Sequence, residues 1–257
     1  MTDKRSPGPS ATGFDFDWVS VDDYERYRPE YAPEAVVWLV EAAGLSTGAR
    51  VVDLAAGTGK LTRLLVKAGL EVISVEPSSA MRSKLAEAVP SAGVLDGTAE
   101  SVPLPHASVE CVTVAQAFHH FHAQSALQEI HRVLRPGGTL ALFWNVYEHG
   151  ETVHSALDDI LDRYVDPTSA VCAAFGAWPK AFEETPLFTS NGQRSFPNVH
   201  RLPSEHLATV MATSSDVASL PPERRDAFLE EIRALARTLP AQLEMSAETR
   251  VDLYVRA

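Results

Sequence analysis

The sequence predicts an α/β protein with a mostly parallel sheet of seven strands and helices on both faces. Short segments that are apolar throughout alternate with segments whose apolar residues recur at helical spacing. This alternation is typical of parallel strands that helices cover on both sides. Glycine or proline stands at many of the junctions. A chain of 257 residues can bury one large core, so we expect one domain over residues 14–257.

The expected elements follow one another in a regular order. Strands are predicted at residues 50–54, 71–75, 93–95, 109–115, 139–144, 193–202 and 250–256. Helices are predicted at residues 33–43, 58–68, 78–88, 123–134, 205–211 and 221–239. The alternation is interrupted over about residues 147–185, and this segment is predicted to be a small helical insertion, or lid, after the fifth strand.

Composition and charge restrict the classes of partner. The net charge of −12 argues against a protein that grips nucleic acid by neutralising phosphates, and it disfavours anionic membrane surfaces. Cys111 and Cys172 are too few for a disulfide framework. Residues 1–13 are rich in Pro, Gly and Ser and are expected to be disordered, without the apolar stretch of a signal peptide. These features favour a cytoplasmic protein that binds neither nucleic acid nor membranes.

A turn of small residues is the strongest local signal. The segment VVDLAAGTGKL, residues 51–61, is a strand that leads into this turn and then into a helix. Small residues let a ligand lie against bare backbone, and the N-terminus of a helix favours polar contacts. About twenty residues later, Glu76 follows the second strand, where a carboxylate can accept both hydroxyl protons of a ribose. Together the two features predict an adenosine-type ligand.

Three ligands compete for this arrangement. A Walker A loop needs Gly at position 54 and Ser or Thr at position 61, but the chain has Leu54 and Leu61. A dinucleotide fingerprint that starts at Gly57 needs Gly at position 62, where Thr62 stands, and this weakens pyrophosphate binding without excluding it. S-adenosylmethionine contains ribose and adenine but no phosphate. It needs only a close backbone and the ribose carboxylate, so it is favoured.

Several further motifs occur in a specific order. They are YERYRPEY at 24–31, DLAAGTG at 53–59, EPS at 76–78, GTAE at 97–100 with Pro103, VTVAQAFHHF at 112–121 and LRPGG at 134–138. With these motifs the chain from Tyr24 onward resembles the class I S-adenosylmethionine-dependent methyltransferases, and more narrowly their small-molecule branch with a Methyltransf_11-type domain. The resemblance implies a Rossmann-like sheet and an enzyme that moves a methyl group from S-adenosylmethionine to a small-molecule acceptor.

The resemblance also implies roles for individual residues around the cofactor. These residues would line the methionine and ribose portions of the cofactor, hold its ribose hydroxyls, flank its adenine or meet the amino edge of the adenine. They are Ala55, Gly57, Gly59, Glu76, Pro77, Met81, Thr98, Ala99 and Gln116. Of these, Glu76 would hold the ribose and Gln116 would lie under the methionine portion. Met81 is equally compatible with a residue of the helix that simply faces the core.

Two positions depart from the family pattern. Relatives commonly carry Gly at Ala55 and Asp at Thr98. The extra methyl group of Ala55 is tolerable if its φ stays negative. Thr98 lacks a charged acceptor for the adenine amino group, so that contact would rest on the backbone. Close to these positions, we expect Lys60 to be solvated and Glu100 to cap a helix rather than to bind ligand.

An N-terminal group and a histidine run are further candidates. Tyr24, Tyr27 and Arg28 lie on a segment that can close over the site, with Arg28 pairing with the cofactor carboxylate. Alternatively, the tyrosines only anchor this segment on the core. His119 and His120 both follow the fourth strand, and either can serve as the base that deprotonates an oxygen or nitrogen acceptor.

Alternatives to these roles stay open. The histidines can instead pack against the following helix, and with His122 they could ligate a metal, which is disfavoured because no carboxylate cluster completes a site. The inserted segment carries Phe175, Trp178 and Phe182, which can form an apolar wall of the acceptor pocket, unless Trp178 packs into the core. A cofactor-binding pseudoenzyme or other protein that binds S-adenosylmethionine without methylating is a second function. A nicotinamide-dependent oxidoreductase is a third, disfavoured by Thr62 and by the lack of an obvious Tyr-x-x-x-Lys pair.

Overall fold

The computed structural model describes residues 20–147, 152–166, 168 and 170–257, except for the side chains of residues 152 and 170–176. The tail expected to be disordered, residues 1–13, lies outside this part of the chain, as does part of the expected insertion. Within the described residues, no helix has the length and apolar character needed to cross a membrane.

A sheet of seven strands forms the centre of the molecule, in the order β3-β2-β1-β4-β5-β7-β6. The strands are β1 (Arg50–Leu54), β2 (Glu71–Val75), β3 (Gly93–Leu95), β4 (Val109–Ala115), β5 (Leu134–Tyr147), β6 (Phe188–Pro203) and β7 (Gln242–Arg256). The first five strands run parallel to one another, whereas β7 runs antiparallel to both β5 and β6. The predicted mostly parallel α/β sheet is therefore confirmed.

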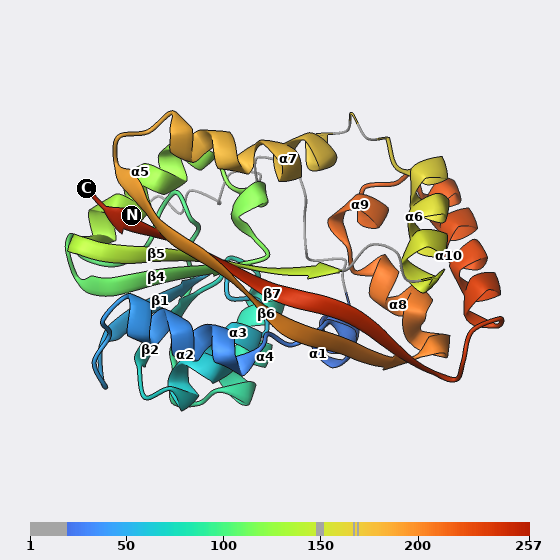
Figure 1. The fold of residues 1–257 in the computed structure, drawn as a ribbon, viewed down its shortest axis with the longest axis horizontal. Coiled ribbons are helices and arrows are strands. Elements are labelled where there is room, and N and C mark those ends of the chain that lie inside the picture. Colours follow the sequence, from blue (N-terminus) through green and yellow to red (C-terminus); the bar gives the residue numbers. More distant parts are fainter. Residues whose placement is uncertain (1–19, 148–151, 167, 169) are drawn as a thin grey trace, which may run out of the picture.

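Helices cover both faces of this sheet (Figure 1). They are α1 (Val21–Tyr27), α2 (Pro33–Ala42), α3 (Lys60–Lys67), α4 (Ser79–Ala88), α5 (Ala123–Val133), α6 (Thr152–Tyr164), α7 (Ala170–Glu183), α8 (Leu207–Ala212), α9 (Ser215–Ala218) and α10 (Pro222–Ala236). Alternate residues of each strand enter different cores, because successive side chains point to opposite faces. Val51 shares a core with Leu65 of α3, and its neighbour Val52 shares one with Ile130 of α5.

The last two strands are longer than the sequence predicts. Residues 193–202 and 250–256 were expected, but β6 spans Phe188–Pro203 and β7 spans Gln242–Arg256. Residues 189–195 of β6 are exposed on both faces, so they lack the apolar alternation that marks a half-buried strand. Their extended conformation comes from pairing with β7 along the edge of the sheet.

Four helices form a cap at one end of the sheet, composed of α6, α8, α9 and α10 (Figure 1). Leu157 of α6, Leu207 of α8 and Phe228 of α10 share a third core. The cap stands at the end toward which the parallel strands run, where ligands of open α/β sheets usually bind. The two helices of the predicted insertion therefore belong to different parts of the molecule. Helix α6 joins the cap, while α7 packs near α5 on the core that contains Val52 and Ile130, called the main core below.

Candidate active site

The turn after β1 has an unusual backbone. Ala55, Gly57 and Gly59 have φ values of 54°, 56° and 87°, in the left-handed region that favours glycine. A Cβ at Gly59 would lie 2.9 Å from Cγ of Leu85, so glycine allows α3 and α4 to approach closely. A Cβ at Gly57 would meet no atom of the described residues within 4 Å. The face of Gly57 is therefore open to a ligand.

Ala55 does not meet the condition set by the sequence analysis. Its extra methyl group was expected to be tolerable at negative φ, but φ is 54°. An L-residue in this conformation brings Cβ close to the following carbonyl oxygen, at a cost of roughly 1–2 kcal/mol. The turn therefore keeps the backbone shape that glycine would adopt, and the alanine bears a local strain.

Asp53, near the end of β1, fixes the strand just before the turn through hydrogen bonds of its side chain. Its carboxylate accepts hydrogen bonds from Thr62 Oγ1 at 2.6 Å and Thr113 Oγ1 at 2.9 Å, and the Thr62 hydroxyl also bonds Ser74 Oγ at 3.0 Å. Burial raises the pKa of Asp53 to about 6, against the lowering effect of the two threonine hydroxyls. Thr62 thus has a structural use at the position where a dinucleotide fingerprint would place its third glycine.

Glu76 is bonded directly to the glycine turn. The Gly57 N–H donates to Oε2 of Glu76 at 2.9 Å, and the Ser78 N–H donates to Oε1 at 2.9 Å. The side chain is buried, and burial raises its pKa although both backbone donors lower it. Each carboxylate oxygen accepts one of these backbone bonds and retains a second acceptor position. The carboxylate can therefore receive two hydroxyl groups at the edge of the turn.

Arg82 is a residue of this region that the sequence analysis missed. Its Nη1 lies 2.7 Å from the carbonyl oxygen of Glu76, 2.6 Å from that of Pro77 and 3.0 Å from Oδ1 of Asp96. The guanidinium holds the peptide that carries Glu76, and its charge lowers the pKa of that carboxyl. Only its position one turn into the helix after Glu76 could have suggested this contact.

The residues expected near adenine have different environments. Pro77 is exposed, whereas Met81 is buried at the start of α4. Ala99 belongs to the main core, so only its backbone is placed to meet a ligand. Thr98 forms an isolated β-bridge with Ser101. Pro77 therefore precedes α4 with its side chain exposed, Met81 lies buried in the first turn of α4, and the side chain of Ala99 is turned into the core.

The side chains of two further polar residues bond to the backbone of neighbouring segments. Gln116 directly follows β4 with φ of 54°, and its side-chain Nε2 donates to the carbonyl oxygen of Asn145 at 3.3 Å. This contact places Gln116 beside the carboxyl end of β5. Glu100 accepts a hydrogen bond from the N–H of His122, which precedes α5, at 2.9 Å. This N–H belongs to the residue before α5 and not to its first turn, so the role of Glu100 as a helix cap stays a prediction.

The two candidate bases form a buried pair in a short 3₁₀ helix, Phe118–His120. The rings of His119 and His120 are 3.9 Å apart, and the ring of His119 lies 5.8 Å from Trp144. Burial lowers the pKa of His119 to about 3, with a contribution from His120, and lowers that of His120 to about 4. Both imidazoles are neutral near pH 7 and can accept a proton, but as weak bases.

Aromatic residues of α7 pack into the core. Trp178 stacks on Trp144 with ring centroids 5.1 Å apart, and Phe182 stacks on Tyr254 at 3.9 Å. Both α7 residues are buried among the main core residues. The side chain of Phe175 lies outside the described residues. Of the two alternatives for Trp178, the structure therefore shows the one in which it packs into the core.

Tyr27 and Arg28 both contact the cap. The Tyr27 ring stacks on His206 at 4.2 Å, and its hydroxyl hydrogen-bonds with His206 Nε2 at 3.1 Å. Arg28 Nε donates to Thr213 Oγ1 at 2.8 Å. Tyr24 differs, because burial and then the nearby Glu76 carboxylate raise its pKa, partly offset by Arg28. The Glu76 charge therefore contributes to the environment of Tyr24, whereas Tyr27 packs against His206.

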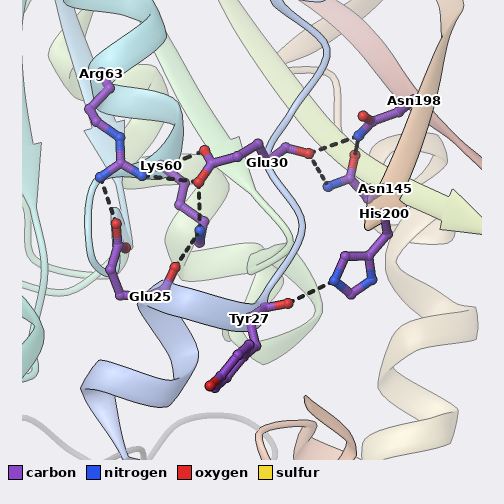
Figure 2. Close-up of polar contacts among 8 residues, drawn as sticks. All are labelled: Glu25, Tyr27, Glu30, Lys60, Arg63, Asn145, Asn198 and His200. Atoms are coloured by element: carbon purple, nitrogen blue, oxygen red, sulfur yellow. Dashed lines mark hydrogen bonds and ion pairs between the residues drawn. The ribbon is translucent and has the colours of Figure 1, made fainter. Parts of the chain in front are cut away.

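Lys60 is buried, which corrects the expectation that it is solvated. Its Nζ donates to the carbonyl oxygen of Glu25 at 2.8 Å and to Oε1 of Glu30 at 2.7 Å (Figure 2). The N-terminal segment lies against the start of α3 and covers the lysine there. A charged residue directly after a glycine turn carries no local signal of burial, because the covering segment is 30 residues away.

The chain is similar to known methyltransferases over most of its length. A family model described as a methyltransferase domain matches residues 52–142. An uncharacterized methyltransferase of Mycobacterium tuberculosis is 37% identical over 230 residues, which cover 86% of this chain and 86% of that protein. An uncharacterized methyltransferase of Schizosaccharomyces pombe is 29% identical over 227 residues, with 86% and 87% covered.

Solved structures share the fold at low identity. A structure described as a type II methyltransferase from Anaeromyxobacter dehalogenans matches with a TM-score of 0.68 and 22% identity, over 90% of this chain and 97% of that one. The cyclase SpnF matches with a TM-score of 0.53 and 15% identity, over 89% and 86%. These structural likenesses show the Rossmann-like fold alone, whereas the sequence relatives show the family. The chain belongs to the class I methyltransferases.

Proposed function

We propose that this protein is an enzyme that transfers the methyl group of S-adenosylmethionine to a small-molecule acceptor. The observation that carries the proposal is the bond between Glu76 and the Gly57 N–H. This bond holds the carboxylate that we assign to the ribose beside the open glycine turn, and a nucleoside without phosphates needs both features. The open face of Gly57 and the second acceptor positions on Glu76 fit such a group.

The cofactor would lie along the carboxyl ends of β1, β2 and β4. We assign its methionine and ribose portions to the backbone of the glycine turn and to Gln116, and its ribose hydroxyls to Glu76. Pro77 and Met81 would flank the adenine, with the backbone at Thr98 and Ala99 beside its amino group. Tyr24 is the residue of the N-terminal segment that we place nearest the ribose, because it lies within reach of the Glu76 charge.

Methyl transfer is an in-line displacement at a sulfonium methyl group, which the cofactor supplies when bound. The contribution of the protein is to align the acceptor and to exclude water. His119 and His120 are neutral at working pH, the state required of a proton acceptor, although their low pKa values make them weak bases. They suit an acceptor that is already acidic or ionised better than an aliphatic alcohol.

Charge and thiol content support further parts of the proposal. The net charge of −12 is unfavourable for holding nucleic acid, which is consistent with a small molecule as the acceptor. The chain has only two cysteines, and Cys111 is a free and fully buried thiol, which fits the reducing environment of the cytoplasm. We therefore place the enzyme in the cytoplasm, acting on a small metabolite.

Two experiments test this function in order. Calorimetric titration with S-adenosylmethionine, S-adenosylhomocysteine and NADH should show binding of the first two alone. Binding of NADH alone would favour the oxidoreductase. A screen of small-molecule acceptors, read by release of S-adenosylhomocysteine, should then yield turnover with at least one acceptor class. Tight cofactor binding without turnover across the screen would instead favour a pseudoenzyme that binds S-adenosylmethionine without methylating.

A further inference from the structure

An N-terminal strap, residues 20–32, is anchored to the sheet through its backbone. Asn145 and Asn198 donate from their Nδ2 atoms to the carbonyl oxygen of Glu30 at 3.1 and 2.8 Å (Figure 2). His200 Nε2 donates to the carbonyl oxygen of Tyr27 at 2.7 Å. These three donors come from β5 and β6, and the bonds involve no acidic side chain of the strap. This neutral anchor therefore joins the strap to the antiparallel edge of the sheet.

A second anchor is ionic and joins the strap to α3. Lys60 Nζ bonds the Glu25 carbonyl oxygen at 2.8 Å and Oε1 of Glu30 at 2.7 Å. Arg63 donates to the carboxylates of Glu25 at 2.8 Å and Glu30 at 3.2 Å. The Lys60 side chain is only 8% exposed, whereas that of Glu30 is 57% exposed. A cation in the first turn of a helix is disfavoured by the helix dipole, so Lys60 depends on these two oxygens.

The strap crosses the region assigned to the nucleoside. Lys60 directly follows the glycine turn, and Asp22 of the strap pairs with Lys84 of α4 at 2.6 Å. The strap thus bridges α3 and α4, the helices that begin just after the glycine turn and just after Glu76. Tyr24 lies between these two contacts in sequence, and burial together with the Glu76 charge raises the pKa of its hydroxyl. A nucleoside bound at Glu76 would therefore lie beneath the strap.

We propose that Lys60 is a positioning residue that fastens the strap over the bound cofactor and thereby sets how fast the nucleoside product leaves. A ligand enclosed by a segment can depart only when that segment moves. The neutral anchor can serve as the hinge, while the pair between Lys60 and half-exposed Glu30 is the contact that opens to water. This inference rests on the proposed function, because it takes Glu76 and the glycine turn as the nucleoside site.

The test is the dissociation rate of S-adenosylhomocysteine, measured by displacement with excess S-adenosylmethionine. Lys60→Gln removes the charge and should accelerate dissociation by about tenfold or more. Lys60→Arg keeps the charge and should restore most of the slow rate. Lys67→Gln is the matched control, because it removes the charge of an exposed lysine from the last turn of the same helix α3 and should change the rate by less than about twofold.

A purely structural role for Lys60 predicts a different result. In that case Lys60→Gln would lower the melting temperature while a folded sample released S-adenosylhomocysteine at the wild-type rate, and this would overturn the inference alone. If Lys60→Gln does not fold, Glu30→Gln breaks the same pair from its exposed side and should show the same acceleration. Failure of the wild-type protein to bind either cofactor form would overturn the proposed function and this inference with it.

Discussion

The backbone N–H of Gly57 donates a hydrogen bond to Oε2 of Glu76 over 2.9 Å. This bond links the turn after β1 to the residue after β2, so the carboxylate assigned to the ribose also holds the turn that the cofactor would lie against. Binding and preorganisation are therefore coupled at one side chain. A change at Glu76 should affect both the contact with the nucleoside and the shape of the turn.

Glu76→Gln should weaken binding of S-adenosylmethionine by about 1.5–3 kcal/mol, the range for hydrogen bonds to a charged group. An amide has one acceptor oxygen instead of two, so the N–H of either Gly57 or Ser78 would face an NH₂ group. Calorimetric titration measures the effect. Glu71→Gln, at the 59% exposed side chain that begins β2, should bind normally. An unchanged affinity in folded Glu76→Gln would remove Glu76 from the site.

Ala55→Gly should stabilise the protein by about 0.5–1 kcal/mol. Glycine relieves the left-handed strain at φ of 54°, and the greater conformational entropy of glycine in the unfolded chain offsets part of this effect. Urea denaturation measures the change. Ala56 is the control, since its φ is not among the positive values. Ala56→Gly should destabilise by about 0.5–1 kcal/mol. Equal effects of both substitutions would show that Ala55 carries no strain.

Asp53→Asn should remove a dependence of stability on pH. Burial raises the pKa of Asp53 from 3.8 to about 6, so the folded state binds the proton more tightly than the unfolded state. The stabilisation from this proton is complete below about pH 4 and is lost as the pH rises through about 6, by up to about 3 kcal/mol. Denaturation at pH 4, 5, 6 and 7 should show this decline in the wild type. If the unfolding free energy of Asp53→Asn declines with pH as steeply as that of the wild type, a group other than Asp53 causes the decline.

His119→Gln and His120→Gln should lower kcat while changing cofactor affinity by less than about threefold, because a base acts on the transition state more than on ground-state binding. Since both histidines are neutral above about pH 4, neither should produce a limb in the rate profile between pH 5 and 8. The assay needs an acceptor from the screen. Wild-type kcat in both variants at every pH would leave alignment alone to explain the rate.

Trp178→Ala should destabilise the protein by about 3–5 kcal/mol, because it empties a site in the main core where the indole stacks on Trp144. Thermal unfolding checks this, and cofactor affinity should fall only as far as the folded fraction falls. Lys180→Ala on the same helix, where the side chain is 73% exposed, should change stability by less than about 0.5 kcal/mol. A stable Trp178→Ala protein with a raised acceptor KM would restore the pocket-wall role.

Local patterns in the sequence determined most of the fold and the position of the glycine turn. The parallel strands and their helices could be predicted because burial on both faces gives continuous apolar runs and helical spacing. The turn could be predicted because its shape demands glycine at Gly57 and Gly59. The distance of about twenty residues to Glu76 follows from the length of one strand, one helix and their connections.

Contacts between distant residues were decided by the tertiary structure alone. Tyr27 meets His206, which is 179 residues away, and Lys60 meets Glu30 beneath a strap that no local pattern ties to α3. The outer part of β6 is extended because β7 pairs with it, although its exposed residues lack alternation. Sequence periodicity records which face of an element is buried, but not which element buries it. The cap, the strap and the core position of Trp178 depend on that second fact.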